Sequence, residues 1–243
     1  SRAWESIPIG HQLYGGRHGY MKGPFWLGRA HPFIFDAQKD YGLSRKFLKS
    51  PPRTPFPKQP PRASLERELP RYTPHTYCSD LLFTFPFTPA KVERALAKGL
   101  DAWESGCADV AEALGQRPTP RAEMELDVIH TITAILRTAF SLVRFYRARD
   151  ALFTGPGSPD VLRSAKTKLK DILDEEIANA KLFLPILKRD PRIGYGPYGR
   201  ANGRVFDAGM VKEKIAQCRY VRDVELPGLV RRILDMTYCD GEE

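Results

Sequence analysis

The sequence contains few cysteines and none of the spacings that cysteine sites use. Its four cysteines are Cys78, Cys107, Cys218 and Cys239, and none forms a C-x-x-C pair or has a histidine at zinc-finger spacing. Cys107 and Cys218 fall on apolar helical stripes, which favours buried free thiols over disulfides or metal ligands. Because free thiols are typical of a reducing compartment, we expect a cytoplasmic protein, with no cofactor and no metal ion.

Long hydrophobic runs and familiar catalytic motifs are missing as well. No uninterrupted apolar run approaches the roughly 18 residues that span a bilayer, so the sequence predicts no membrane-spanning segment and no membrane partner. The first 16 residues, SRAWESIPIGHQLYGG, show no apolar core of a signal peptide. No G-x-S-x-G, P-loop, H-E-x-x-H or thiol-protease pattern occurs, which leaves open whether the chain is an enzyme.

The charge that is present is distributed unevenly. The 243 residues include 38 Lys+Arg and 29 Asp+Glu, for a formal net charge of +9. Residues 1–80 hold 13 basic and 6 acidic residues, a net charge of +7, together with 11 of the 21 prolines. This change of composition divides the chain into a basic, aromatic- and proline-rich part, residues 1–87, and a second part, residues 88–243.

The first part lacks both helical and strand periodicity but holds twelve aromatic residues in its first 80 positions. Each ring can bury on the order of 150–250 Å², so we expect an irregular segment that docks its rings onto the helices or onto a partner. Six prolines in KSPPRTPFPKQPPRA (49–63) predict an extended polyproline strap, favoured over an SH3-type ligand. The run DLLFTFPF (80–87) predicts an edge strand or an extended entry into the core.

The second part shows apolar residues at spacings of three and four, which is typical of amphipathic helices. Capping residues followed by proline mark three helix starts, at Thr88-Pro89, Thr119-Pro120 and Ser158-Pro159. The predicted helices cover 88–115, 119–152, 158–189 and the residues from Asp207 onward, with Pro227 kinking or splitting the last. The widened apolar face of the second helix indicates two neighbours. Short connections between the first three helices favour antiparallel neighbours, so we predict a mainly α fold, an antiparallel bundle of about four long helices.

One candidate binding segment is GHQLYGGRHGYMKGPFWLGRAHPF (10–33), where aromatic faces alternate with hydrogen-bond donors. Such a platform suits a sugar ring or another polar small molecule, and its histidine spacing fits no metal signature. The candidate substrate-binding residues here are His18, Tyr20, Trp26 and His31. The alternative is that these rings are simply the core of a packed segment.

A second candidate lies after the third helix. Residues 194–199 formally match G-x-G-x-x-G, but a helix precedes them and a proline interrupts them, so a loop is favoured over a nucleotide site. Asp190 and Arg192 at the start of this loop either pair and pin it or hydrogen-bond a ligand. Pairing is favoured, and both residues remain candidates for substrate binding.

Two groups of polar and charged helix residues are expected to lie at the surface. On the second helix the polar residues are Glu123, Asp127, His130, Arg137, Ser141 and Arg144. A solvated face is the first interpretation, and a pocket that His130 and Arg137 build against the opening segment is the alternative. The run 174–176, Asp-Glu-Glu, is predicted to be surface charge, because acid–base chemistry needs carboxylates that face each other across a substrate.

Three stretches together resemble a known kind of protein. They are GYMKGPFWLGRAHPF (19–33), DEEIANAKLFLPILKRDPRIGYG (174–196) and MVKEKIAQCRYV (210–221). They are similar to the C-terminal region of large bacterial proteins of the TIM-barrel glycoside-hydrolase type, in which an extended segment leaves the barrel and a helical domain follows. The resemblance implies a catalytic barrel ahead of this region, and no (β/α)8 unit fits beside four long helices in 243 residues.

Two functions therefore stand as hypotheses. In the first, the chain is the helical C-terminal portion or accessory subunit of a carbohydrate-active protein, giving packing and sugar contacts, with a carbohydrate ligand and a catalytic domain as partners. In the second, it is a non-catalytic scaffold subunit of a large assembly with an extended basic N-terminal arm. The positive charge invites a nucleic-acid partner, but the basic residues are scattered among prolines and no recognition motif occurs, which disfavours one.

Overall fold

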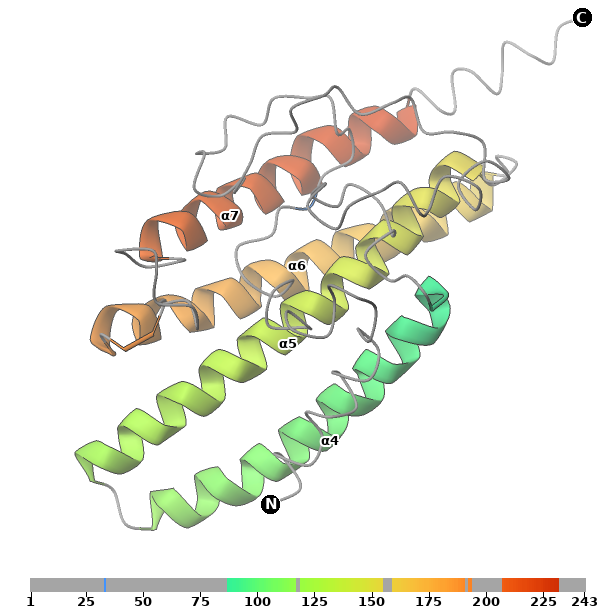
Figure 1. Ribbon diagram of the computed structural model, residues 1–243. Helices are drawn as coiled ribbons and strands as arrows, with labels where there is room; N and C mark the ends of the chain where they lie inside the picture. Colours follow the sequence, from blue (N-terminus) through green and yellow to red (C-terminus); the bar gives the residue numbers. More distant parts are fainter. Residues whose placement is uncertain are drawn as a thin grey trace, which may run out of the picture.

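The structure, a computed structural model, describes Phe33 and residues 87–116, 119–154, 159–190, 192–193 and 207–231, with 150–154 described by backbone alone. Within these ranges the chain forms helices and no strand (Figure 1). The helices are α4 (Pro89–Gly115), α5 (Pro120–Thr154), α6 (Pro159–Arg189) and α7 (Ala208–Tyr220), and α7 continues through a π-helical turn, η3 (Val221–Glu225). The predicted mainly α, antiparallel helical bundle is confirmed.

The four helices follow one another in a row, and each runs antiparallel to the one before it (Figure 1). Contacts join α4 to α5, α5 to α6, and α6 to α7. Four residues separate α4 from α5 and α5 from α6, as expected for antiparallel helical neighbours, whereas 18 residues separate the end of α6 at Arg189 from the start of α7 at Ala208. The row places α4 and α7 at its two edges and α5 and α6 at its centre.

The helix starts use side-chain caps, as the sequence predicts. The bonds run from Lys91 N to Thr88 Oγ1 (3.4 Å), from Ala122 N to Thr119 Oγ1 (3.1 Å) and from Met210 N to Asp207 Oδ1 (3.0 Å). Each bond satisfies one of the backbone donors that a helix start leaves without an intrahelical partner. At the other end, α4 stops at the predicted Gly115, and Gln116 after it keeps a right-handed backbone, so this stop does not use a left-handed glycine.

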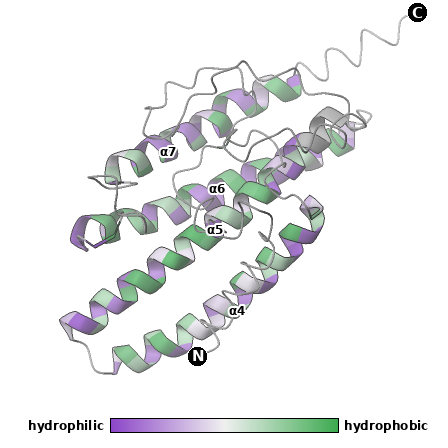
Figure 2. Ribbon diagram, in the orientation of Figure 1, coloured by the Kyte–Doolittle hydropathy of each residue, from purple (hydrophilic) through white to green (hydrophobic). Residues whose placement is uncertain are grey.

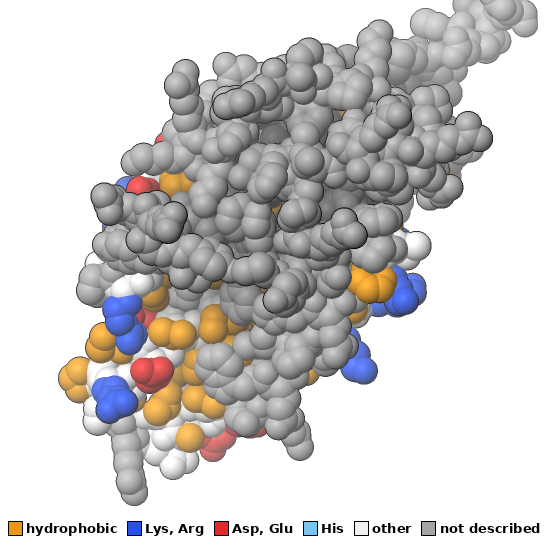
Figure 3. All heavy atoms as spheres, viewed as in Figure 1, with side chains coloured by type: hydrophobic (Ala, Val, Ile, Leu, Met, Phe, Trp, Pro, Cys, Tyr) orange, Lys and Arg blue, Asp and Glu red, His pale blue; other side chains and the backbone are white. Residues whose placement is uncertain are grey.

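The main hydrophobic core lies where α5, α6 and α7 meet. Its fully buried members include Ala139, Leu142, Val143, Leu169, Ile172, Leu173, Cys218 and Val221. A second, smaller cluster joins α4 to α5 through Trp103 and Ile129. Apolar stretches recur along the helices between polar ones (Figure 2), and hydrophobic side chains reach the surface over α4 and α5 (Figure 3). The two interfaces of α5 are therefore packed to different extents.

The central helix α5 is more apolar on average than its interrupted apolar runs suggest. Its residues Pro120–Arg149 are long and apolar enough to cross a membrane by length and composition alone, although charged residues such as Arg137 and Arg144 interrupt the runs. The absence of a membrane-spanning segment stays a prediction. Half of the most apolar window is buried inside the protein. A core helix with neighbours on two sides needs a wide apolar surface, and α5 has the two predicted neighbours, α4 and α6.

Pro227 does not split the last helix. The chain passes through the π-helical turn η3, where Leu226 N bonds to Val221 O, and residues 226–231 are helical again. A proline lacks the backbone N–H and its ring crowds the carbonyl four residues earlier, so a wider turn just before it gives the ring room. The continued helix keeps Leu226 and Val230 in the core.

Within residues 1–86 the structure describes one residue, Phe33. Its ring is fully buried and meets the ring of Phe145 on α5 edge to face, with centroids 5.1 Å apart. At this position an aromatic ring of the opening part lies against a helix, and the docking of the segment as a whole stays a prediction. The predicted strap (49–63) and the run 80–86 lie outside the described residues.

Candidate functional site

A buried ion pair lies at the centre of the α5–α6–α7 interface. Lys214 Nζ on α7 pairs with Glu176 Oε1 on α6, and the two residues are only 2% and 1% exposed. Isolated charges are rarely buried, because a charge that leaves water must find a partner. The helical repeat brings both residues inward: Glu176 follows Ile172 by four positions, and Lys214 precedes Cys218 by four.

Thr138 on α5 connects this ion pair to the third helix of the interface. Its hydroxyl donates to Glu176 Oε1 (2.6 Å) and its oxygen accepts from Lys214 Nζ (3.3 Å) and from Asn179 Nδ2 (3.2 Å). Asn179 Nδ2 also donates to the backbone oxygen of Ala134 (2.9 Å). One hydroxyl thus links α5, α6 and α7, and its hydrogen-bonding capacity is fully used. The second carboxylate oxygen, Glu176 Oε2, is buried with no hydrogen-bond partner among the described residues.

The same cluster holds the backbone of Phe33. Phe33 N donates to Gln217 Oε1 (3.3 Å), and Gln217 Nε2 donates to Phe33 O. A single side-chain amide therefore satisfies both backbone polar groups of a buried residue, as a neighbouring strand would. Lys214 Nζ lies 5.6 Å from the centroid of the Phe33 ring, within the range of a cation–π interaction.

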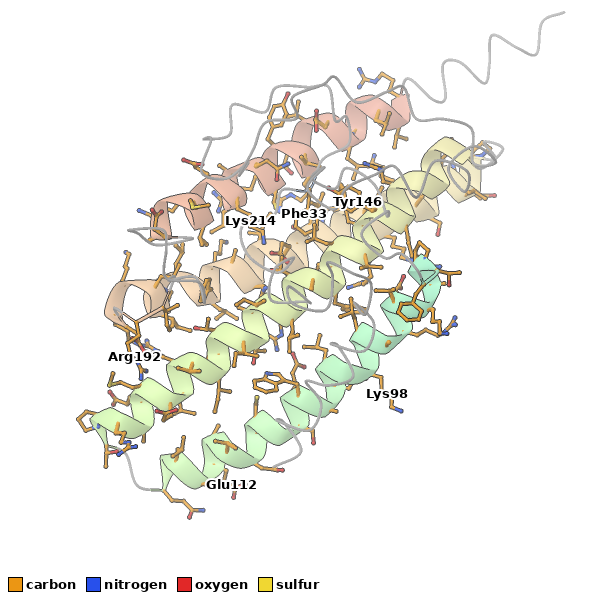
Figure 4. All side chains as sticks on the ribbon, in the orientation of Figure 1. Phe33, Lys98, Glu112, Tyr146, Arg192 and Lys214 are labelled. Carbon is orange, nitrogen blue, oxygen red and sulfur yellow. The ribbon has the colours of Figure 1, made fainter. Side chains whose placement is uncertain are left out.

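We call the contact set Phe33, Phe145, Lys214 and Gln217, with Glu176 and Thr138 behind Lys214, the Phe33 clamp. In Figure 4 Phe33 and Lys214 lie next to each other between α5 and α7. The clamp joins Phe33, from the opening part of the chain, to three helices. These groups are suited to binding and positioning: the carboxylate of Glu176 and the ammonium of Lys214 are paired, and the Gln217 amide uses both its oxygen and its nitrogen in hydrogen bonds.

The cysteines near these helices are not activated. Cys107 and Cys218 are free thiols, half-buried and buried respectively, as the sequence predicts. Burial raises the pKa of Cys218 far above its ordinary value, against a smaller opposing effect of Lys214. Burial also raises the pKa of Cys107. Both thiols therefore stay protonated near neutral pH, and a protonated thiol is a poor nucleophile.

Asp190 and Arg192 form the predicted pair. The buried carboxylate of Asp190 accepts from Arg192 N (2.9 Å), Nε (3.0 Å) and NH2 (2.7 Å), and Arg192 NH2 also reaches the backbone oxygen of Met124 (2.8 Å). The hydrogen bonds from Arg192 lower the pKa of Asp190. The geometry is that of a pin between the end of α6 and the start of α5, and it lies apart from the Phe33 clamp (Figure 4). Ligand binding by these two residues stays a prediction.

The remaining predicted site residues, His18, Tyr20, Trp26 and His31, and the glycine-rich residues 194–199 lie outside the described residues. Among the residues that are described, no group of three or more histidine, cysteine, aspartate or glutamate side chains is placed to hold a metal ion.

Two expectations about surface charge are wrong. The polar face of α5 is not simply solvated: Asp127 and Ser141 are buried, Arg137 pairs with Glu104 on α4, and Arg144 pairs with Glu175 on α6. The alternative pocket is not supported for Arg137, which faces α4, and His130 is exposed.

Glu176 is the second correction, because it is buried and not part of a surface charge run. The signal that identifies it is its position on the apolar stripe, four residues before Ala180 and three after Leu173. Lys214 lies on the stripe of its own helix in the same way, three residues after Val211. A charged residue on each of two apolar stripes is the sequence signal that indicates a buried ion pair.

No family model, no curated protein and no solved structure matches this chain.

Proposed function

We propose that this chain is a helical, non-catalytic portion of a carbohydrate-active protein of the glycoside-hydrolase type, and that it holds the extended segment around Phe33 in place. The observation that carries the proposal is a convergence. Described residues from each of the three stretches that carry the resemblance, 19–33, 174–196 and 210–221, meet in the Phe33 clamp. Each contributes at least one buried contact residue: Phe33, Glu176, and Lys214 with Gln217.

The convergence matters because the stretches are far apart along the chain. Phe33 and Gln217 are separated by 184 positions, yet they exchange two hydrogen bonds. In proteins of the resembled type, an extended segment precedes a helical domain, and a clamp between the two gives them a defined relative position. The clamp is therefore a contact that such an arrangement of segment and helical domain would need.

The clamp chemistry favours a positioning role over a catalytic one. The Glu176 carboxylate is already paired with Lys214, and the thiol of the neighbouring Cys218 is held protonated by burial. General acid–base work needs a group that exchanges a proton with the substrate, and a nucleophile needs access to it. We therefore expect any hydrolytic activity to come from a catalytic barrel associated with this chain.

The test compares two preparations on a panel of p-nitrophenyl glycosides and oligosaccharides. One is the recombinant 243-residue chain, and the other is the native protein, tagged and purified from its own cells, with its intact mass measured. We expect no turnover by the recombinant chain and hydrolysis of at least one substrate by the native preparation. A native preparation that hydrolyses none of them, and binds none by calorimetry, would reject the proposal.

The second candidate function is a scaffold subunit of a large assembly, and the net charge of +7 on residues 1–80 favours it. A basic arm of this kind suits an acidic partner surface, since complementary charge guides association. Native mass spectrometry of the same tagged protein discriminates the two functions. A complex of defined stoichiometry without glycosidase activity supports the scaffold, whereas an active preparation supports the first proposal.

A further inference from the structure

We propose that the Phe33 clamp is a peptide-recognition site: it binds one aromatic residue of an extended peptide through both main-chain polar groups and the ring, and in this structure Phe33 of the same chain occupies it. The inference concerns only the contacts of the clamp, so it does not depend on the carbohydrate-related function.

Main-chain recognition comes from Gln217. Its amide oxygen accepts from the backbone N–H of Phe33, and its amide nitrogen donates to the backbone C=O. Edge-type peptide recognition uses the same pair of bonds, because every residue except proline offers one donor and one acceptor. Gln217 is itself buried, so if the peptide left and no replacement arrived, its amide nitrogen would lose this backbone acceptor and its amide oxygen would keep only the weak contact from Cys218 Sγ (3.8 Å).

Selectivity for an aromatic residue comes from the surroundings of the ring. The ring of Phe145 meets Phe33 edge to face at 86°, and the ammonium of Lys214 lies 5.6 Å from the Phe33 centroid. An edge-to-face contact and a cation both prefer the electron-rich face of an aromatic ring, which an aliphatic side chain lacks. Glu176 and Thr138 hold Lys214 from behind and so keep the cation in place.

The connection between the site and its occupant is long. Phe33 lies more than 50 positions before Phe87, the next described residue along the chain. A covalent connection of that length raises the local concentration of Phe33 at the clamp. The entropic cost of closing such a loop grows only slowly with its length. The contacts at the clamp must therefore supply the selectivity for an aromatic residue. A separate peptide with the same sequence is expected to bind at the clamp in place of the chain's own Phe33.

The first experiment uses fluorescence anisotropy with a labelled peptide of residues 26–40, WLGRAHPFIFDAQKD. The binding partner is the full chain carrying Phe33→Ala, whose own segment then lacks the anchoring ring. We expect saturable binding of the native peptide and at least about 30-fold weaker binding of a Phe33→Ala peptide, since most of the buried ring contact is lost. A Phe33→cyclohexylalanine peptide keeps the shape but loses the π-face, and we expect about 5-fold weaker binding.

The matched control is the same chain with Gln217→Ala added, which is expected to abolish saturable peptide binding. Equal affinity for the native and Phe33→Ala peptides, or no binding by a chain that circular dichroism shows to be folded, would overturn the proposal.

A second measurement covers the case in which the Phe33→Ala chain does not fold. A protease recognition sequence is inserted within residues 49–63 of the otherwise unchanged chain, and the cut protein is followed by size-exclusion chromatography. We expect the N-terminal fragment to stay bound after cleavage and to be released at least about 10-fold faster from a Gln217→Ala body, because a peptide bound through its main chain loses both bonds. Equal release rates from the two bodies would overturn the proposal.

Discussion

The helix α5 meets its two neighbours in different ways. On the α6–α7 side, Glu176 and Lys214 are almost completely buried and share the Thr138 hydroxyl. On the α4 side, the side chains of Arg137 and Glu104 pair while remaining 42% and 37% exposed. Each pair joins a glutamate to a cationic side chain, but the energetic consequence of breaking the pair differs. Removing one member of a buried pair leaves a charge without compensation, whereas an exposed pair loses little when it breaks.

The apolar packing of the two interfaces differs in the same direction. The main core joins α5, α6 and α7 and also takes in the first turns of α4, through Val92 and Leu96, whereas Trp103 and Ile129 form a small separate cluster whose neighbours are only half-buried. The main core therefore holds three helices, Phe33 and the start of α4 together, and the rest of α4 packs on α5 at the edge of the row. The mutations below are ordered by how strongly each tests this difference.

The largest effect is expected for Lys214→Met, which leaves the Glu176 carboxylate buried with one oxygen already unpartnered. We expect a loss of about 3–5 kcal/mol in the free energy of unfolding, measured with urea. The double variant Lys214→Met/Glu176→Gln removes the uncompensated charge and should recover much of that loss. If the double variant is as unstable as the single one, burial of the unpaired charge is not the cause.

A smaller effect is expected for Asp190→Asn, about 2 kcal/mol at neutral pH, because bonds to a charged carboxylate are stronger than neutral ones. Arg192 lowers the pKa of Asp190 in the folded state. The stabilisation is therefore present above the ordinary carboxylate pKa, near 4, and is lost as pH falls through the lower folded-state pKa. Urea unfolding of both proteins from pH 7 to pH 2 should show the difference shrinking below about pH 4. A difference that is constant over this range would contradict the ion-pair explanation.

On the α4 side, Trp103→Phe is expected to cost about 1 kcal/mol, the typical net value of one hydrogen bond. The indole Nε1 donates to Thr133 Oγ1 (2.9 Å), and phenylalanine keeps an aromatic ring but loses this donor. Thermal unfolding of this variant, of Thr133→Val and of the double variant forms a double-mutant cycle. Simple additivity of the two changes would show that the bond does not couple α4 to α5.

The smallest effect is expected for Arg137→Gln, within about 0.5 kcal/mol, because exposed ion pairs contribute little and salt screens them. Urea unfolding at low and at high salt should give nearly the same free energy for the variant and the wild-type chain. A loss above about 2 kcal/mol would show that the α4 interface behaves like a buried one and would remove the contrast drawn above.

Sequence patterns predicted much of the fold and little of the candidate site. The starts of α4, α5 and α7 were predictable because a capping side chain bonds to a backbone N–H only three residues away. The sequence analysis does not predict the Phe33 clamp, because it places Glu176 in a surface charge run and makes no prediction for Lys214, although both positions lie on apolar stripes. For Asp190 and Arg192 the predicted pairing was correct, since the two residues are neighbours in the chain.

The sequence by itself determined where the described helices begin and that α4, α5 and α6 run antiparallel in succession, because these properties depend on residues a few positions apart and on short connections. Only the tertiary structure decided that Glu176 faces Lys214 and that Gln217 receives Phe33 from 184 positions away. The physical reason is that a helical repeat tells which residues share a face but not which two faces meet. That choice follows from how the side chains of several helices pack and pair at once.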